Sequence, residues 1–247
     1  PLVVGNLISL KGMATHMVDS TTALVVPVLA FYLDGGSQKI LVDTGVSSHN
    51  QGGSAEMEKA LDGIGLKPQD IDIVIITHLH FDHAANIGMF PQARFILQKE
   101  EWLYAKAPLP IQQGMYAPEL LSELEGYDLL LVDDNYAVAD GVKVIRVPGH
   151  TKGQQAVAVN TSDGTYVIAG DLLYSYINIY PERDEFTDLF GNKIPCTPLY
   201  GHAFYPPGIH TDLSDWYESV WRVLATAGSR RRIIPGHDPA VIGRTFP

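Results

Sequence analysis

The segment Thr77-His78-Leu79-His80-Phe81-Asp82-His83 contains three histidines and one aspartate within six residues, directly after the largely apolar run 71–76. Imidazole and carboxylate groups are ligands that suit zinc and its neighbours among the first-row metals. In an extended segment, side chains two residues apart point to the same side, so His78 and His80 can share one ion. Asp82 and His83 follow where the chain can turn towards a second ion. We interpret the segment as half of a two-metal site.

The charge, cysteine content and hydrophobic runs indicate which partners and which compartment to expect. The chain has 247 residues and a formal net charge of −11, which argues against a nucleic-acid partner, because binding phosphates requires clustered Lys and Arg. The single cysteine, Cys196, excludes an internal disulfide and suits a reducing compartment. No apolar run approaches the roughly 20 residues that span a bilayer, and no signal peptide is visible. We therefore expect a cytoplasmic protein with no membrane partner.

The hydrophobic pattern predicts two similar halves, each with strands followed by helices. This order favours two β-sheets covered by helices on the outside, and the absence of an obvious linker favours one domain over residues 1–247. A long region, 172–210, is predicted to be irregular, and Thr211 is predicted to cap the following helix. The expected strands are 2–10, 24–33, 39–42, the apolar run 71–76 before the histidines, 94–98, 142–147, 155–160, 165–169 and 232–234, and the expected helices are 54–61, 99–106, 118–124 and 212–227.

Three further ligand-type residues follow apolar strands and a glycine. They are His150 after Val147-Pro148-Gly149, Asp171 after Ala169-Gly170, and His237 after Pro235-Gly236. Strand ends that gather along one edge of a layered fold are positions where functional groups converge on a rigid scaffold. We expect these three side chains to join the histidine-rich segment.

The series from His78 to His237 resembles the metallo-β-lactamase superfamily over almost the whole chain. This resemblance implies an α/β fold of the αββα sandwich type, with a dinuclear site between the two sheets. It also implies that Asp43, in the turn Asp43-Thr44-Gly45, orients the ligands. Carried over residue by residue, one ion is bound by His78, His80 and His150, the other by Asp82, His83 and His237, and Asp171 bridges them.

Within the superfamily, the chain looks most like the N-acyl homoserine lactone lactonases. It has Asp171 near the position where the founding β-lactamases use cysteine, and His80 where flavodiiron proteins carry glutamate. The residue that points most strongly to this branch is Tyr174, three residues after Asp171, because a tyrosine at this offset contacts the substrate carbonyl in those lactonases. The resemblance implies two Zn²⁺ ions per chain, with iron, manganese or cobalt as alternatives.

The same resemblance implies a reaction in which a metal-bridging hydroxide attacks the ring carbonyl of a lactone, as in quorum quenching. Asp82 would orient the water and pass its proton to the leaving alkoxide, and the Tyr174 hydroxyl would stabilise the oxyanion. The substrate is then a small cyclic ester or amide.

The aromatic region after Asp171 leaves the substrate open. We expect it to form the wall of the substrate pocket, with His202 and Phe204 as candidate substrate contacts, or to make a homodimer contact. An aromatic wall would also suit an aromatic lactone, a lactam or a cyclic carbamate.

Other functions on the same scaffold remain open. One is an iron-dependent oxidoreductase similar to persulfide dioxygenases, and another is a catalytically silent binding protein. His16 and His49 have no partner pattern, so we expect them in loops or at the surface.

Overall fold

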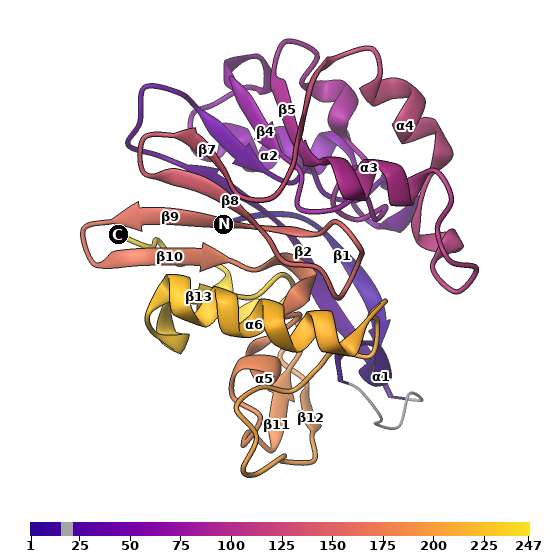
Figure 1. The fold of residues 1–247 in the computed structure, drawn as a ribbon, viewed down its shortest axis with the longest axis vertical. Helices are drawn as coiled ribbons and strands as arrows, with labels where there is room; N and C mark the ends of the chain where they lie inside the picture. The colour runs from indigo at the N-terminus through magenta and orange to yellow at the C-terminus, as the bar shows by residue number, and fades with distance from the viewer. Residues whose placement is uncertain (16–21) are drawn as a thin grey trace.

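Two β-sheets lie face to face, with helices on their outer sides (Figure 1). The computed structural model describes residues 1–15 and 22–247 of the chain, so His16 lies outside the described residues. His49 is exposed, as expected. In the view of Figure 1, α2, α3 and α4 lie in the upper part beside β4 and β5, and α6 lies below β9 and β10. This is the αββα sandwich that the sequence predicted.

The elements over the described residues have the following bounds. The helices are α1 (Lys11–Ala14), α2 (Ser54–Asp62), α3 (Lys99–Ala105), α4 (Pro118–Leu124), α5 (Tyr176–Ile179) and α6 (Leu213–Ala227). The strands are β1 (Leu2–Leu10), β2 (Ala23–Leu33), β3 (Ile40–Val42), β4 (Ile73–Ile75), β5 (Arg94–Gln98), β6 (Asp128–Val132), β7 (Tyr136–Ala139), β8 (Val142–Arg146), β9 (Gln155–Thr161), β10 (Gly164–Ile168), β11 (Glu185–Thr187), β12 (Lys193–Pro195) and β13 (Ile233–Ile234).

The two large sheets have different strand directions. The first sheet has the order β1-β2-β3-β4-β5-β6, in which β1, β2 and β3 pair antiparallel and β3 to β6 pair parallel. The second sheet has the order β13-β10-β9-β8-β7, with only the β10–β13 pair parallel. Parallel strands point their carboxyl ends to the same edge, so the turns that follow β3 and β4 begin side by side.

Alternating side chains of the first sheet belong to two different cores. Ile73 and Ile75 of β4 face the second sheet, whereas Val74 between them packs with the residues under α2, α3 and α4. A strand buried on both faces requires apolar residues at every position, which explains the continuous apolar run before the histidines. Because β2 also contributes to both cores, we propose that residues 1–247 fold as one domain.

Helix α6 covers the second sheet through Trp216. The Trp216 side chain is fully buried, and its Nε1 donates a hydrogen bond to the Leu172 carbonyl at 2.7 Å. The helix begins after Asp212, whose carboxylate accepts hydrogen bonds from Ser214 N and Asp215 N. The prediction that Thr211 caps this helix is therefore wrong, because Thr211 instead donates to the Gly149 carbonyl beside His150.

The region 172–210 is less irregular than the sequence predicted. It contains α5 and the antiparallel hairpin of β11 and β12, which projects at the bottom of Figure 1. These elements are three or four residues long, so their periodicity is too short to recognise in the sequence. Among the described residues, no helix combines the length and apolar character that crossing a bilayer requires.

Candidate metal centre

The ligand-type residues follow the ends of strands from both sheets. Asp43 follows β3 and the segment 77–83 follows β4 in the first sheet. His150 follows β8, and His237 follows β13, in the second. Asp171 lies in a short 3-10 helix just after β10. The sheets are joined at this edge by a hydrogen bond from Gln155 N to the Thr77 carbonyl at 3.0 Å.

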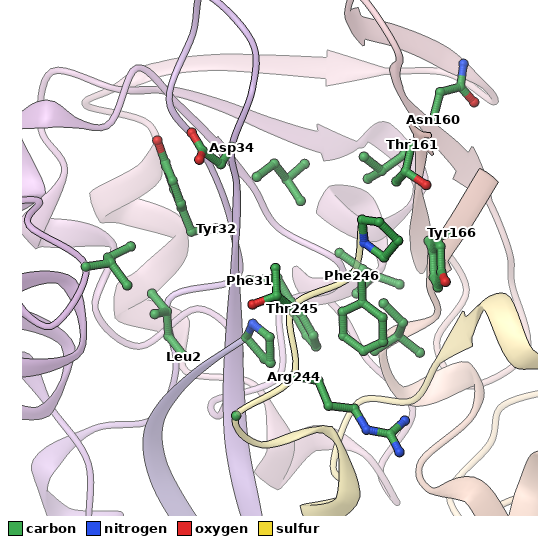
Figure 2. A pocket seen from close by; sticks show the side chains of 18 residues that line it. Leu2, Phe31, Tyr32, Asp34, Asn160, Thr161, Tyr166, Arg244, Thr245 and Phe246 are labelled. Atoms are coloured by element: carbon green, nitrogen blue, oxygen red, sulfur yellow. The ribbon is translucent and has the colours of Figure 1, made fainter. Parts of the chain in front are cut away.

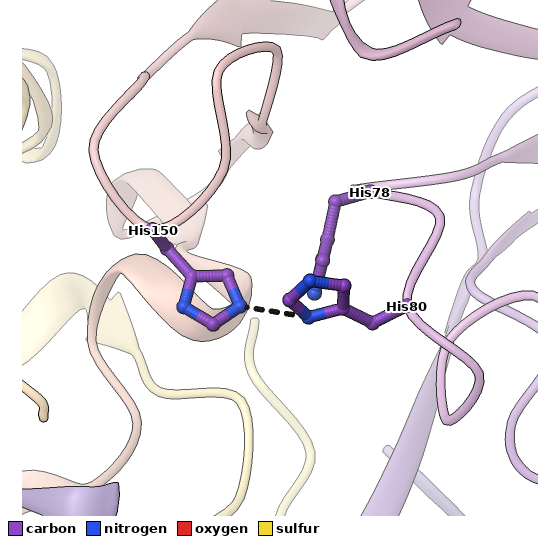
Figure 3. A group of neighbouring side chains, drawn as sticks. All are labelled: His78, His80 and His150. Atoms are coloured by element: carbon purple, nitrogen blue, oxygen red, sulfur yellow. Dashed lines mark hydrogen bonds between the residues drawn. The ribbon is translucent and has the colours of Figure 1, made fainter. Parts of the chain in front are cut away.

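Seven buried side chains form two neighbouring clusters. In the three-histidine cluster, His78 and His80 come from one segment and face His150 from the other sheet (Figure 3). His150 Nε2 lies 3.1 Å from His80 Nδ1. The four-residue cluster consists of Asp82, His83, Asp171 and His237. Within each cluster, one ligand atom from every residue lies within 4.8 Å of the others.

The Asp171 carboxylate lies between the two clusters. Its Oδ1 is 3.0 Å from His237 Nε2 and 3.2 Å from His83 Nε2, and its Oδ2 is 3.6 Å from His150 Nε2. One oxygen therefore faces each cluster, which is the placement that a bridging ligand needs. The seven residues that the sequence predicted are brought together; their role as ligands stays a prediction.

Several atoms of the clusters are buried without a hydrogen-bond partner in the described part of the chain. Leaving such an atom unpaired costs about 1–3 kcal/mol, so the arrangement fits a bound cation that accepts the lone pairs. The donor set of imidazoles and carboxylates is also the set that zinc-type ions prefer. These atoms are His78 Nε2 and His80 Nε2, together with His83 Nε2, His237 Nε2 and Asp171 Oδ1, of which the Asp171 oxygen lies 3.0–3.2 Å from the two nitrogens.

Contacts at Nδ1 fix which ring nitrogen carries the proton. His150 Nδ1 donates to the Ile209 carbonyl, and His237 Nδ1 donates to the Pro27 carbonyl, each at 2.9 Å. His83 Nδ1 lies 2.8 Å from Asp43 Oδ2. Since carbonyl and carboxylate oxygens only accept, Nδ1 holds the proton in all three rings. The Nε2 lone pairs are left for an ion, as is usual at metal sites.

Asp43 is also connected to His78, through hydrogen bonds with Thr77. Thr77 donates to Asp43 from its backbone N at 2.7 Å and from its hydroxyl at 2.8 Å. The hydroxyl proton is thus committed to Asp43, so its oxygen can accept from His78 Nδ1, 3.1 Å away. Asp43 therefore orients His83 directly and His78 through Thr77, as the resemblance implied. Sequence reasoning missed Thr77, although it stands directly before His78.

Burial and neighbouring charges shift the histidine pKa values in opposite directions in the two clusters. Burial lowers the pKa values of His78, His80 and His150, so these imidazoles are neutral. Burial also acts to lower the pKa of His83 and of His237, but the charges of Asp171 and Asp82 outweigh it and raise both values. Burial acts to raise the pKa of Asp171, yet His237 and His83 hold it well below its usual range. Protons and a cation therefore compete for the same nitrogens in the four-residue cluster.

The remaining predicted site residues lie in different surroundings. Tyr174 is buried with its ring centroid 4.4 Å from that of His237, and burial together with the charges of Asp171 and Asp82 raises the pKa of its hydroxyl. Phe204 is buried against α6, edge-on to Trp221. His202 is exposed. Only Tyr174 is in contact with a cluster residue through its ring, and the substrate roles of all three stay predictions.

A separate cavity of about 460 Å³ lies where the two chain ends meet (Figure 2). Its wall includes Phe31 of β2, Tyr166 of β10 and Phe246, whose ring packs against Tyr166. Among the described residues, its lining includes no member of either cluster. The candidate site is therefore identified by its converging ligand atoms and not by this cavity.

The comparison with known families decides the assignment. Residues 23–237 match the model of the Metallo-beta-lactamase superfamily, which covers most of the chain. The chain belongs to this superfamily. Its paired clusters fit the dinuclear site that the resemblance implied.

Individual relatives are consistent with the lactonase-like branch. The chain is 29% identical to an N-acyl homoserine lactonase of Bacillus cereus over 181 residues, which span 64% of this chain and 69% of the lactonase. It is 33% identical to Metallo-beta-lactamase domain-containing protein 1 of Mus musculus over 175 residues, 62% of this chain and 59% of that protein. Together, family and relatives support a hydrolase of this superfamily.

A solved structure supports the fold. The crystal structure of a quorum-quenching N-acyl homoserine lactone lactonase matches with a TM-score of 0.78 at 23% identity, covering all of this chain and 95% of that one. At this identity the likeness establishes the αββα architecture alone.

Replacing Asp43 with Asn should weaken metal binding at the four-residue cluster. All three groups that contact the carboxylate donate hydrogen bonds to it. The NH₂ of an asparagine also donates, so at least one of these three groups would lose its acceptor. Loss of such an orienting partner costs about 10–100-fold in metal affinity. Cobalt titration followed by absorption measures the change; an affinity equal to that of the wild type would contradict the assigned role of Asp43.

Proposed function

We propose that this protein is a dinuclear zinc hydrolase that opens a lactone of the acyl homoserine lactone kind. The observation that carries the proposal is the pair of buried clusters whose ligand atoms converge in two neighbouring groups, with Asp171 between them. The lactonases among the relatives support the choice of a cyclic ester as the substrate class. Two Zn²⁺ per chain suit the imidazole-rich donor set.

The three-histidine cluster would hold one ion and the four-residue cluster the other, with Asp171 contacting both. When bound there, the ions would supply an acidified water and an electrophile for the substrate carbonyl. The chain itself then has to orient the water, move its proton and stabilise the charge that develops on the carbonyl oxygen.

Asp82 is suited to moving the proton. Its Oδ2 lies 3.6 Å from His83 Nε2 and 3.5 Å from His237 Nε2, so the carboxylate reaches the region in which the attacking water must lie. It can take a proton from that water as the new C–O bond forms. It can return the proton to the alkoxide as the ring C–O bond breaks, which leaves a hydroxy acid.

Tyr174 is suited to stabilising the oxyanion. Its hydroxyl keeps its proton because burial and the charges of Asp171 and Asp82 raise its pKa. A protonated hydroxyl beside the clusters can donate a hydrogen bond to the carbonyl oxygen as negative charge develops there.

The packing around Tyr174 favours a second group of substrates. Tyr174 belongs to an apolar cluster that includes Val26, Ile177, Phe186 and Tyr205. If this partly aromatic cluster borders the substrate, it suits a flat ring, so an aromatic lactone, a lactam or a cyclic carbamate is the alternative substrate class.

Metal analysis and a substrate panel test the proposal. We expect about two zinc equivalents per chain, and acid release from N-acyl homoserine lactones, measured with a pH indicator. Aromatic lactones and benzoxazolinone-type carbamates test the alternative. One iron per chain with no turnover of any cyclic ester or carbamate would instead favour an oxidoreductase similar to persulfide dioxygenases and would defeat the proposal.

Replacing Asp82 with Asn should lower the turnover rate more than the metal content. The amide cannot accept the proton of the attacking water, and such proton transfers contribute about 10²–10⁴-fold to a rate. Three ligands of the four-residue cluster remain in place. Steady-state kinetics and elemental analysis of one preparation measure both quantities. A rate that falls only in proportion to lost metal would show that Asp82 is a ligand and nothing more.

Replacing Tyr174 with Phe should lower kcat on the order of 100-fold, with little change in metal content, because one oxyanion donor is removed. The ring keeps its packing against His237, but the hydrogen bond between its hydroxyl and Ser9 is lost, so stability should fall by about 1 kcal/mol. Steady-state kinetics on the best substrate of the panel measure the effect. An unchanged kcat would exclude the Tyr174 hydroxyl from the reaction.

A further inference from the structure

Glu101 is a buried acid that the reaction scheme above does not use. It lies in the first turn of α3, and its side chain is fully buried. It forms no salt bridge with any residue that the structure describes. Burial raises its pKa, although four hydrogen bonds act in the opposite direction. A buried carboxylate without a basic partner is expensive, so its contacts require an explanation.

One carboxylate oxygen binds the segment that carries His78 and His80. Oε1 accepts a hydrogen bond from Leu79 N at 3.0 Å and another from the Tyr116 hydroxyl at 3.1 Å. Leu79 lies between the two histidines in the sequence. The Tyr116 ring packs edge-on against His80, with the ring centroids 4.9 Å apart. Both donors therefore adjoin the three-histidine cluster.

The other oxygen binds the segment that carries His150. Oε2 accepts from the Thr151 hydroxyl at 2.6 Å and from Gly153 N at 3.2 Å. A Cβ on Gly153 would collide with the backbone of Glu101, so only glycine allows this close approach. The backbone of Glu101 is thus in direct contact with the backbone of Gly153, three residues after His150.

The two segments come from different sheets, and Glu101 connects them. His78 and His80 follow β4 in the first sheet, and His150 follows β8 in the second. The three ligand atoms converge only if these segments keep a fixed separation. Glu101 accepts two hydrogen bonds from each segment, and it acts beside the hydrogen bond from Gln155 N to the Thr77 carbonyl.

From these contacts we propose that Glu101 is a positioning residue for the three-histidine cluster: it holds the His78–His80 segment and the His150 segment at the spacing that one metal ion requires. The inference rests on the metal-binding role given to this cluster in the proposed function. It assigns Glu101 no contact with the substrate. An amide cannot replace the carboxylate without loss, because its NH₂ would face either Leu79 N or Gly153 N, which can only donate, whereas the Tyr116 and Thr151 hydroxyls can turn to accept.

The Glu101→Gln variant tests this role through metal binding. We expect affinity for one of the two ions to fall about 10–100-fold, the usual cost of losing a group that orients ligands, while the other ion remains bound. Cadmium-113 NMR identifies the weakened site, because the chemical shift separates a nitrogen-only ligand set from one with carboxylate oxygens. The weakened site should be the nitrogen-rich one.

Asp188→Asn is the matched control. Asp188 is also buried, and its carboxylate accepts hydrogen bonds from Phe190 N, Asn192 N, Asn192 Nδ2 and the backbone of Val25, but it lies next to β11, outside both clusters. This variant should lose stability and keep both ions. If Glu101→Gln behaves in the same way, with a lower melting temperature and unchanged affinity for both ions, Glu101 is structural only and the inference is wrong.

Thr151 provides a milder pair of variants that decides the matter if Glu101→Gln does not fold. Thr151→Val removes one hydrogen bond to Oε2 and should weaken the same site, whereas Thr151→Ser should restore it. Equal metal binding by the Val and Ser variants would overturn the inference. A wild-type protein that binds two ions but opens no cyclic ester would defeat the proposed function and leave the role of Glu101 intact.

Discussion

The burial of two facing apolar sheet surfaces is the constraint on which the candidate site depends. The first sheet presents Ile73 and Ile75 to the second, which presents residues such as Val144 and Val157. Side chains that face each other across the sandwich can exclude water only if the sheets stay in register. This fixes where each strand ends, and the polar turns after those ends then meet at one edge. The convergence of the candidate metal ligands is thus a consequence of core packing.

Two buried carboxylates act on this edge in the same way. Asp43 accepts hydrogen bonds from Thr77 and His83, and Glu101 accepts them from residues that flank the three-histidine cluster. The described contacts of both carboxylates are with proton donors. A buried acid costs free energy unless its oxygens are fully hydrogen-bonded, so each carboxylate is fixed in orientation. Asp43 thereby fixes the His83 ring, and Glu101 contacts both segments that carry the three-histidine cluster.

Sequence reasoning recovered the ligand-type residues because each carries a local signal. A histidine or aspartate directly after an apolar strand and a glycine is visible without any tertiary information, as for His150 and His237. The helix cap at Asp212 was assigned one residue too early, since Thr and Asp are both good caps and only the hydrogen bonds distinguish them. Glu101 was overlooked. Its one sign was an acid on the buried face of α3, next to Trp102 and four residues before Ala105.

The sequence alone therefore determined the αββα fold, the ligand types and their order along the chain, because these depend on short-range patterns of burial and polarity. The tertiary structure alone decided which nitrogens are free and which segments are connected. The proton on His237 is fixed by the carbonyl of Pro27, 210 residues away, and the His150 segment is held by a side chain of α3. Backbone carbonyls occur at every residue, so no sequence pattern identifies the one that a folded chain brings to a given ring.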